Sequence, residues 1–258
     1  MNLQISRSKW LPASLKNLML EFLDFIVSLV EANKPFIPLL QRQTNLKAEF
    51  FLDSPEAGGS AILLVPHLLR DFPGCEISVL ADHLSPERKA HFQNLIPELS
   101  SQVRFIEQKD IGLRSDHSEK FLISINQAHL FSDDELMARL KDFQTKFDQI
   151  LIGEGNNKSG RQVIGMLILA PLVAIVCAPF VKPFRLLRLV FTFLIPLLPL
   201  MIAWDGIVAL FKIRSPERLK ELMTSDGTDG WTWKVGKSPN NRGGFVIFLQ
   251  GIRSARHS

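Results

Sequence analysis

The sequence predicts an α/β protein built on a doubly wound, mostly parallel sheet. Short apolar segments with strand character alternate with helical segments, which is the sequence pattern of such a sheet. Two helical segments open with the same Ser-Pro-Glu-Arg sequence, at Ser85 and Ser215. The last two strand segments are separated only by a short turn, which predicts an antiparallel last strand.

The first 46 residues are expected to form a helical segment that packs on the main domain. Between Pro12 and Glu31, apolar residues recur at three- and four-residue spacing, which is typical of an amphipathic helix. Charged side chains at Lys16, Glu21 and Asp24 interrupt its apolar pattern, so it is not predicted to be a signal peptide.

The main domain is predicted to occupy residues 47–258 and to begin with five strands. These strands are predicted at Phe50–Leu52, Ile77–Ala81, Val103–Ile106, Phe121–Ile125 and Gln149–Ile152. Helices are predicted at Ala61–Arg70, from Ser85 to Leu95 and from Ser132 to Lys146, and closing strands at Trp231–Val235 and Gly244–Gly251. Ser85 and Ser132 are each followed by acidic residues within the next turn, so both serines are expected to cap the helices that they precede.

An apolar insertion, Val163–Trp204, follows the fifth strand. It contains nineteen uncharged residues, Val163–Val181, and sixteen more, Leu189–Trp204, joined by a link that carries three basic residues. As straight helices these runs would rise ~28 and ~24 Å, against ~30 Å for the hydrocarbon core of a bilayer.

Three arrangements of this insertion are consistent with its composition. It could span the membrane twice, lie within one leaflet with its basic link at the lipid headgroups, or pack into the protein core or a dimer interface. Basic residues flank both ends of each run and prolines interrupt both runs, which weighs against spanning. The sequence therefore favours a hairpin in one leaflet, with Lys182, Arg185 and Arg188 facing anionic lipid.

The charge and the cysteines place the protein at the cytoplasmic face of a membrane. A net charge of +4 suits an anionic lipid surface and is too weak and scattered to indicate nucleic acid. Two distant cysteines, Cys75 and Cys177, indicate a reducing compartment. The six histidines show no metal-ligand spacing, so no metal is predicted.

Acidic residues and glycines lie where the predicted strands end. Asp53 ends the first strand and precedes Gly58 and Gly59, whose backbone N–H groups could approach a ligand closely. Asp82 ends the second strand, where a carboxylate can bind both hydroxyls of a ribose. Asp110 follows the third strand. Ligands of open parallel sheets bind beyond the carboxyl ends of the strands, so these residues predict one site.

Taken in order, FLDSPEAGGS, VLADHLSPE, QKDIG and LISINQAHLFSDDEL resemble the class I S-adenosylmethionine-dependent methyltransferases. The later segment WDGIVALFKIRSPERLKEL resembles a bacterial, membrane-associated branch of that family, in which an apolar hairpin follows the fifth strand. The resemblance covers residues 47–253 and implies a Rossmann-like sheet and S-adenosylmethionine as cofactor.

The resemblance also implies roles for individual residues. Asp53, Gly58 and Gly59 stand in the first cofactor motif, Asp82 at the ribose position and Asp110 at the adenine position. The loop with Asn126, Gln127 and His129 would face the substrate and the methionine end of the cofactor. His129 or Glu154 could remove a proton from the acceptor.

The first cofactor loop departs from the family pattern. Pro55 and Ala57 stand where glycine is expected, and proline lacks an N–H while alanine disfavours positive φ. Two functions therefore follow from the sequence. One is methyl transfer to an apolar or membrane-associated acceptor. The other is a non-catalytic membrane-associated scaffold that keeps a degenerate methyltransferase fold.

Overall fold

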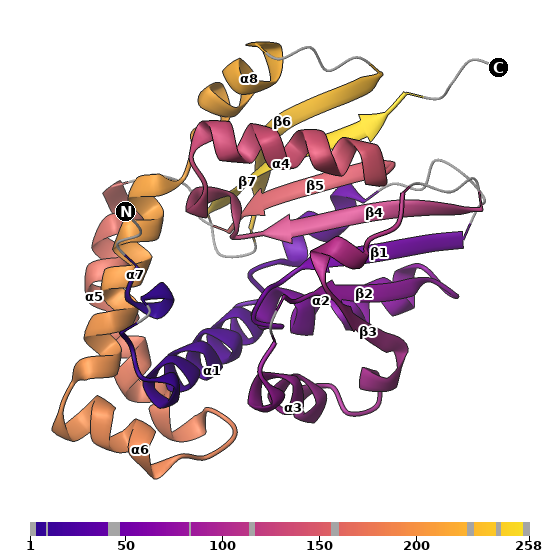
Figure 1. Ribbon diagram of the computed structural model, residues 1–258. Helices are drawn as coiled ribbons and strands as arrows, with labels where there is room; N and C mark the ends of the chain where they lie inside the picture. The colour runs from indigo at the N-terminus through magenta and orange to yellow at the C-terminus, as the bar shows by residue number, and fades with distance from the viewer. Residues whose placement is uncertain are drawn as a thin grey trace.

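A computed structural model describes the chain over residues 4–8, 10–40, 47–82, 84–113, 117–155, 160–225, 230–240 and 244–254. Within these ranges seven strands form one sheet in the order β3-β2-β1-β4-β5-β7-β6 (Figure 1). The strands are β1 (Lys47–Asp53), β2 (Glu76–Leu80), β3 (Val103–Ile106), β4 (Ser118–Ile125), β5 (Gln149–Glu154), β6 (Trp231–Pro239) and β7 (Phe245–Arg253).

The sheet is parallel from β3 to β5 and antiparallel at its other edge. β7 pairs antiparallel with both β5 and β6, which confirms the predicted closing hairpin. Residues Asn241–Gly243 of the turn between β6 and β7 lie outside the described residues. The doubly wound α/β class predicted from the sequence is therefore confirmed.

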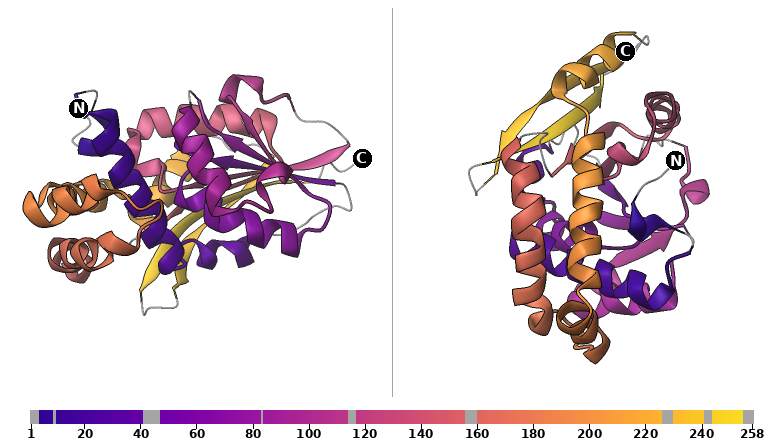
Figure 2. Two further views of the ribbon diagram at one scale, coloured as in Figure 1. Left: turned by 90° about the horizontal axis from the view of Figure 1, so that it is seen from below. Right: turned by 90° about the vertical axis from the view of Figure 1, so that its left-hand side faces the viewer.

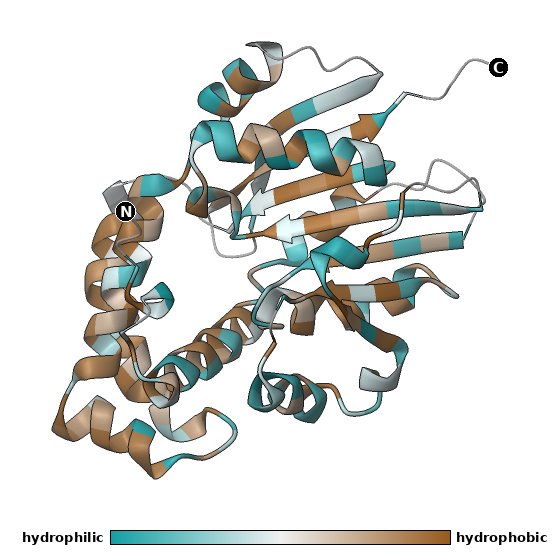
Figure 3. Cartoon of the chain, in the orientation of Figure 1, coloured by the Kyte–Doolittle hydropathy of each residue, from teal (hydrophilic) through white to brown (hydrophobic). Residues whose placement is uncertain are grey.

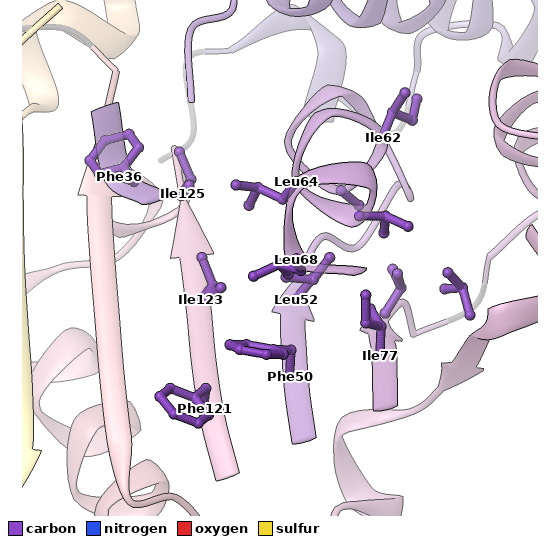
Figure 4. Packing of buried hydrophobic residues seen from close by; sticks show 14 of the residues in the cluster. Phe36, Phe50, Leu52, Ile62, Leu64, Leu68, Ile77, Phe121, Ile123 and Ile125 are labelled. Carbon is purple, nitrogen blue, oxygen red and sulfur yellow. The ribbon is translucent and has the colours of Figure 1, made fainter. Parts of the chain in front are cut away.

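Alternation along the strands divides the core between the two faces of the sheet. Phe50 and Phe121 pack on one face with α2 (Gly59–Asp71) and α3 (Pro86–Leu95), and Figure 4 shows this cluster. Neighbouring side chains, such as that of Phe51, point to the other face, which α4 (Asp133–Lys146) and α8 (Pro216–Ser225) cover. Successive side chains of a strand point to opposite faces, so apolar runs in β1 and β4 bury both faces at once.

The predicted helix caps are present. Ser85 Oγ accepts a hydrogen bond from the backbone N–H of Arg88 at 3.2 Å, and Ser132 forms a reciprocal capping box with Glu135. These contacts satisfy N–H groups that a helix leaves unpaired at its start.

The apolar insertion forms a helical hairpin with a broken second arm. Its first arm is α5 (Gly160–Cys177), and the second run is broken into α6 (Leu186–Leu189), a π-helical turn (Val190–Leu194) and α7 (Leu197–Lys212). The prolines of the second run were expected to interrupt it, and the segments before and after the break meet at 79°. Pro196 lies at the break and has no backbone N–H to continue the helix.

The hairpin lies along the side of the sheet domain. α5 and α7 pack against each other, and α1 (Ala13–Leu29) packs against both α2 and α7 (Figures 1 and 2). A buried cluster joins Leu18, Met19 and Phe22 of α1 to Ala174 of α5 and Ile202 of α7. The N-terminal helix therefore packs on both the hairpin and the sheet domain.

The basic link of the hairpin makes protein contacts that the sequence did not predict. Arg185 Nη2 lies 2.7 Å from a carboxylate oxygen of Glu21 in α1, and Arg188 Nη2 contacts the other oxygen. Arg188 is only 1% exposed, and its Nη1 donates to the carbonyl of Val181 at 2.6 Å. The expectation that all three basic side chains face lipid headgroups was wrong for Arg188, because Glu21 and backbone carbonyls hold it inside the protein.

Candidate functional site

A cavity of about 330 Å³ lies at the carboxyl ends of β1, β4 and β5. The loops after these three strands form one side of it, and α1, α5 and α7 form the opposite side. Of the residues predicted to form a site, six line this cavity: Gly58, Gly59, Asn126, Gln127, His129 and Glu154. The cavity therefore lies where ligands bind in open parallel sheets.

His129 and Glu154 form a buried pair inside the cavity. The His129 Nδ1 atom lies 3.0 and 3.2 Å from the two carboxylate oxygens of Glu154. The backbone N–H of His129 also donates to Glu154 Oε1 at 2.8 Å. This geometry assigns the ring proton to Nδ1 and leaves Nε2 as the atom that can accept a proton.

The loop after β4 is held by its own backbone conformation. Asn126 has a φ of 58°, in the left-handed region that asparagine tolerates better than most residues. Its N–H donates to the Gly153 carbonyl at 2.8 Å, and its Oδ1 accepts from the Gly155 N–H at 2.7 Å. The Asn126 side chain thereby fixes the position of the chain that leaves β5.

The N-terminal segment covers His129. The sequence analysis did not predict this contact. Gln4 Nε2 lies 3.4 Å from His129 Nε2, and Arg7 Nη2 donates to Gln127 Oε1 at 3.2 Å. Asp205 of α7 holds this segment, because its carboxylate accepts the backbone N–H groups of Ile5 at 2.6 Å and Ser6 at 3.0 Å. Asp205 is an isolated acidic residue in an apolar helix. This isolation is the feature of the sequence that could have indicated a buried polar contact here.

The loop between β1 and α2 has the conformation that glycine favours. Ala57 is fully buried with a φ of 45°, so an alanine occupies a left-handed position, as its departure from the family pattern implied. The N–H groups of both glycines have partners within the protein. That of Gly58 donates to Ser54 Oγ at 3.1 Å, and that of Gly59 to Asp24 Oδ1 at 2.6 Å.

Asp24 reaches this loop from α1. Its other carboxylate oxygen lies 2.7 Å from Nη2 of Arg88, and both side chains are nearly fully buried. Arg88 Nε in turn donates to the carbonyl of Glu56 at 3.0 Å. A buried ion pair therefore holds the first cofactor-motif loop against the N-terminal helix.

Asp53 lies behind the loop and does not line the cavity. Its carboxylate accepts a hydrogen bond from Ser124 Oγ at 2.7 Å, and Arg139 Nη2 lies 3.6 Å away. Burial raises the pKa of Asp53, and the Ser124 hydrogen bond and the Arg139 charge only partly oppose this rise. The side chain thus contacts β4 and α4 behind the cavity.

Asp82 and Asp110 do not line the cavity. Asp82 Oδ1 accepts the backbone N–H of Gln108 at 2.8 Å, and Asp110 is exposed in the short turn after β3. The structure thus divides the predicted cofactor residues between the cavity and the adjoining edge of the sheet. The segment Asn156–Ser159, after Glu154, lies outside the described residues.

Arg214, just after α7, supports the turn that carries His129. Its guanidinium donates to the carbonyls of Ala128 at 2.8 Å and Phe131 at 2.6 Å, and its Nε to Asp133 Oδ1 at 2.6 Å. These contacts connect the end of the hairpin to the candidate base. Among the described residues, no group of three His, Cys, Asp or Glu side chains is placed to hold a metal ion.

No family model matches the sequence, and no curated protein matches it. Solved structures do match the fold. NcsB1, an O-methyltransferase from neocarzinostatin biosynthesis solved with S-adenosylmethionine and 2-hydroxy-5-methyl naphthoic acid, aligns with a TM-score of 0.51 at 14% identity, over 93% of this chain and 57% of that one.

Two further structures align similarly. The CMeT domain of citrinin polyketide synthase has a TM-score of 0.51 at 12% identity, over 91% of this chain and 56% of that one. PigF with SAH has a TM-score of 0.50 at 12% identity, over 93% of this chain and 60% of that one. The chain therefore spans less than two thirds of each, and it has the fold of class I S-adenosylmethionine-dependent methyltransferases. None of the three is described as a membrane protein, so the branch suggested by the sequence finds no counterpart among them.

Proposed function

We propose that this protein binds S-adenosylmethionine and transfers its methyl group to an apolar, membrane-associated acceptor. The observation that carries this proposal is the composition of the cavity. On one side it has Gly58 and Gly59 from the cofactor-motif loop, and on another the His129–Glu154 pair. A loop that can approach a cofactor and a candidate base thus face one space on a methyltransferase fold.

In this proposal the predicted cofactor residues hold the two ends of the cofactor. Gly58, Gly59, Asn126 and Gln127 lie along the cavity and would contact its methionine end. Asp82 and Asp110, at the ends of β2 and β3, would hold the ribose and the adenine beyond the cavity. When bound, the cofactor supplies an activated methyl group on a positively charged sulfur.

The protein's own contribution is orientation and proton removal. Glu154 fixes the His129 ring, so Nε2 can accept the proton that an acceptor hydroxyl or amine loses as it is methylated. The Gln4 side chain lies against His129 Nε2, so the N-terminal segment must move away before an acceptor can reach this atom.

The cavity wall supports an apolar acceptor. Met166 of α5 and Ile202 and Ala209 of α7 line it opposite the cofactor loop. The same hairpin exposes apolar side chains on its outer side, and Val163–Phe180 has a mean hydropathy of 2.6, which is apolar enough to enter a membrane by length and composition. The same pair of helices thus lines the cavity on one side and, in this proposal, contacts the membrane that holds the apolar acceptor on the other.

One observation favours the second candidate, a non-catalytic membrane-associated scaffold. The N–H groups of Gly58 and Gly59 already donate to Ser54 and Asp24, and Ala57 places a methyl group in the loop. If these contacts persist, the loop offers the cofactor fewer free donors than the family's loop does.

Calorimetric titration with S-adenosylmethionine separates the two candidates. The proposal expects saturable binding by the wild type, weakened about 10- to 100-fold in Asp82→Ala by the loss of charge-assisted hydrogen bonds. Asp142→Ala, on the exposed side of α4, is the matched control and should bind like the wild type. No binding heat and no thermal shift at saturating cofactor would support the scaffold and refute methyl transfer.

A further inference from the structure

The outer side of α5 presents apolar side chains over most of the helix circumference. Exposed positions include Ile164, Leu167, Leu169, Leu172, Val173 and Val176. At 100° per residue, these exposed positions cover an arc of about 240° around the helix axis, with Leu167 at one edge and Val173 at the other. Only 11% of the Val163–Phe180 window is buried. We call this surface the outer face.

The remaining arc of α5 packs inward. Met166 lines the cavity, and Ala174 joins the cluster shared with α1 and α7. A rigid partner with a flat surface contacts one side of a helix, whereas liquid hydrocarbon can surround an exposed arc of any width. The width of the outer face therefore favours lipid over a second copy of the chain (Figure 3 shows the apolar ribbon).

The charges at the hairpin tip complement an anionic lipid surface. No charged residue occurs from Val163 to Val181, and Lys182, Arg185 and Arg188 follow within seven residues. Glu21 pairs with both arginines and Arg188 is buried, so Lys182 and Arg185 are the basic side chains exposed at the tip. Phe180, Phe184 and Leu186 are largely exposed around this tip. An apolar surface bordered by positive charge is typical of proteins that rest in one anionic leaflet.

The contacts of α1 oppose movement of the tip across a bilayer. Glu21 holds Arg188 at the tip, while Asp24, one turn further along the same helix, holds Arg88 and Gly59 of the sheet domain. Moving the tip through the hydrocarbon would either break the buried Glu21–Arg188 pair or draw a charged helix in with it. Each outcome places unpaired or poorly solvated charge in a medium where charge is costly.

We propose that the hairpin lies in the plane of a single anionic leaflet, with the outer face in the acyl chains and the tip at the headgroups on the side of the sheet domain. The proposal deepens the membrane contact on which the proposed function rests, and it is independent of whether methyl transfer occurs. A second copy on the outer face and a double span are its two competitors.

The test uses the full chain with both cysteines, Cys75 and Cys177, replaced by serine. Lys182→Cys then places one thiol at the tip. After binding to sealed vesicles that contain about one quarter phosphatidylglycerol, the protein is treated with a membrane-impermeant maleimide before and after detergent. Gln93→Cys, exposed on α3, is the control for full accessibility.

The in-plane arrangement expects Lys182→Cys to be labelled without detergent to the same extent as Gln93→Cys. Protection of Lys182→Cys until detergent is added would show that the tip has crossed, and would overturn the proposal. Failure to float with vesicles, together with a dimer mass by light scattering, would overturn it in favour of a second copy.

A substitution on the outer face tests the surface itself. Leu172→Glu places a charge in the middle of the outer face and is expected to reduce partitioning into anionic vesicles about tenfold or more. Gln93→Glu adds the same charge on α3 and should leave partitioning nearly unchanged. Equal partitioning of the two variants would refute the outer face as the lipid contact. Cofactor titration of the same samples reports separately on the proposed function.

Discussion

The carboxylate of Asp24 accepts a hydrogen bond from the backbone N–H of Gly59, at 2.6 Å, where α2 begins. An anion at the start of a helix is stabilised by the unpaired N–H groups and by the helix dipole. Here that anion comes from the protein's own N-terminal helix. The contact makes α1 part of the candidate cofactor site, although α1 precedes the sheet domain in the chain.

Replacement of Asp24 by alanine is expected to lower the free energy of unfolding by about 3–5 kcal/mol, because it leaves Arg88 buried without its carboxylate partner. Urea unfolding followed by circular dichroism measures this. Lys34→Ala removes an exposed ion pair with Glu31 and should cost about 0.5 kcal/mol or less. A loss for Asp24→Ala as small as that of the control would contradict the structural role of the pair.

Replacement of Asp53 by asparagine is expected to stabilise the protein increasingly as pH rises. Burial raises the folded-state pKa of Asp53, so the folded protein favours the protonated carboxyl. The cost of ionising this carboxyl in the folded state is absent below its ordinary pKa of about 4 and complete above the raised value.

The measurement is the difference in unfolding free energy between Asp53→Asn and the wild type, from urea unfolding at pH 4 and pH 7. Other carboxyl groups titrate alike in both proteins, so they cancel in this difference. The variant should gain on the wild type towards pH 7. If the difference stays constant, or if the variant loses stability relative to the wild type towards pH 7, burial does not raise the pKa of Asp53.

Gly153→Ala is expected to destabilise the protein by about 1–3 kcal/mol through overpacking. A Cβ at this position of β5 would clash with the ring of Phe36, which is fully buried. Phe36→Leu makes room for the methyl group. Gly153→Ala should therefore cost less stability in the Phe36→Leu background than in the wild type. Thermal unfolding of the four proteins in this cycle gives the coupling, and strictly additive effects would contradict the contact.

His129→Ala is expected to lower methyl transfer about 10²- to 10⁴-fold while leaving S-adenosylmethionine binding within a few fold. Activity is measured as radiolabelled methyl groups that pass from the cofactor into the organic extract of membranes from the expression host. His67→Ala, on α2 and outside the cavity, is the control. Unchanged transfer by His129→Ala would remove the His129–Glu154 pair from the proposed mechanism.

Elements whose causes are local were predictable from the sequence. The serine caps of α3 and α4 need only residues three positions away, and the apolar runs of β1, β4 and β5 follow from burial on both faces of a parallel sheet. The fold class followed from their alternation. The rule that ligands bind at the carboxyl ends of parallel strands predicted Gly58 and Gly59 at the site, and the family resemblance added Asn126, His129 and Glu154; these five residues line the cavity.

Contacts between distant parts of the chain decided the rest. Asp205 binds Ile5 across 200 residues, and Glu21 binds Arg188 across 167. A sequence shows an isolated charge in an apolar segment, but the partner depends on how helices pack after the chain has folded. For the same reason the contact between the hairpin and α1 was absent from the sequence prediction, whereas the prolines that interrupt the second run are visible in the sequence.

The sequence by itself determined the doubly wound sheet, the order of its elements and an apolar insertion after the fifth strand, because these depend on periodicity and local capping. Only the tertiary structure decided that Asp24 of the N-terminal helix binds the loop with Gly58 and Gly59, and that Glu21 of the same helix binds the arginines of the hairpin tip. Both contacts bury charge, and a buried charge is stable only beside a partner, which in this fold comes from a remote helix.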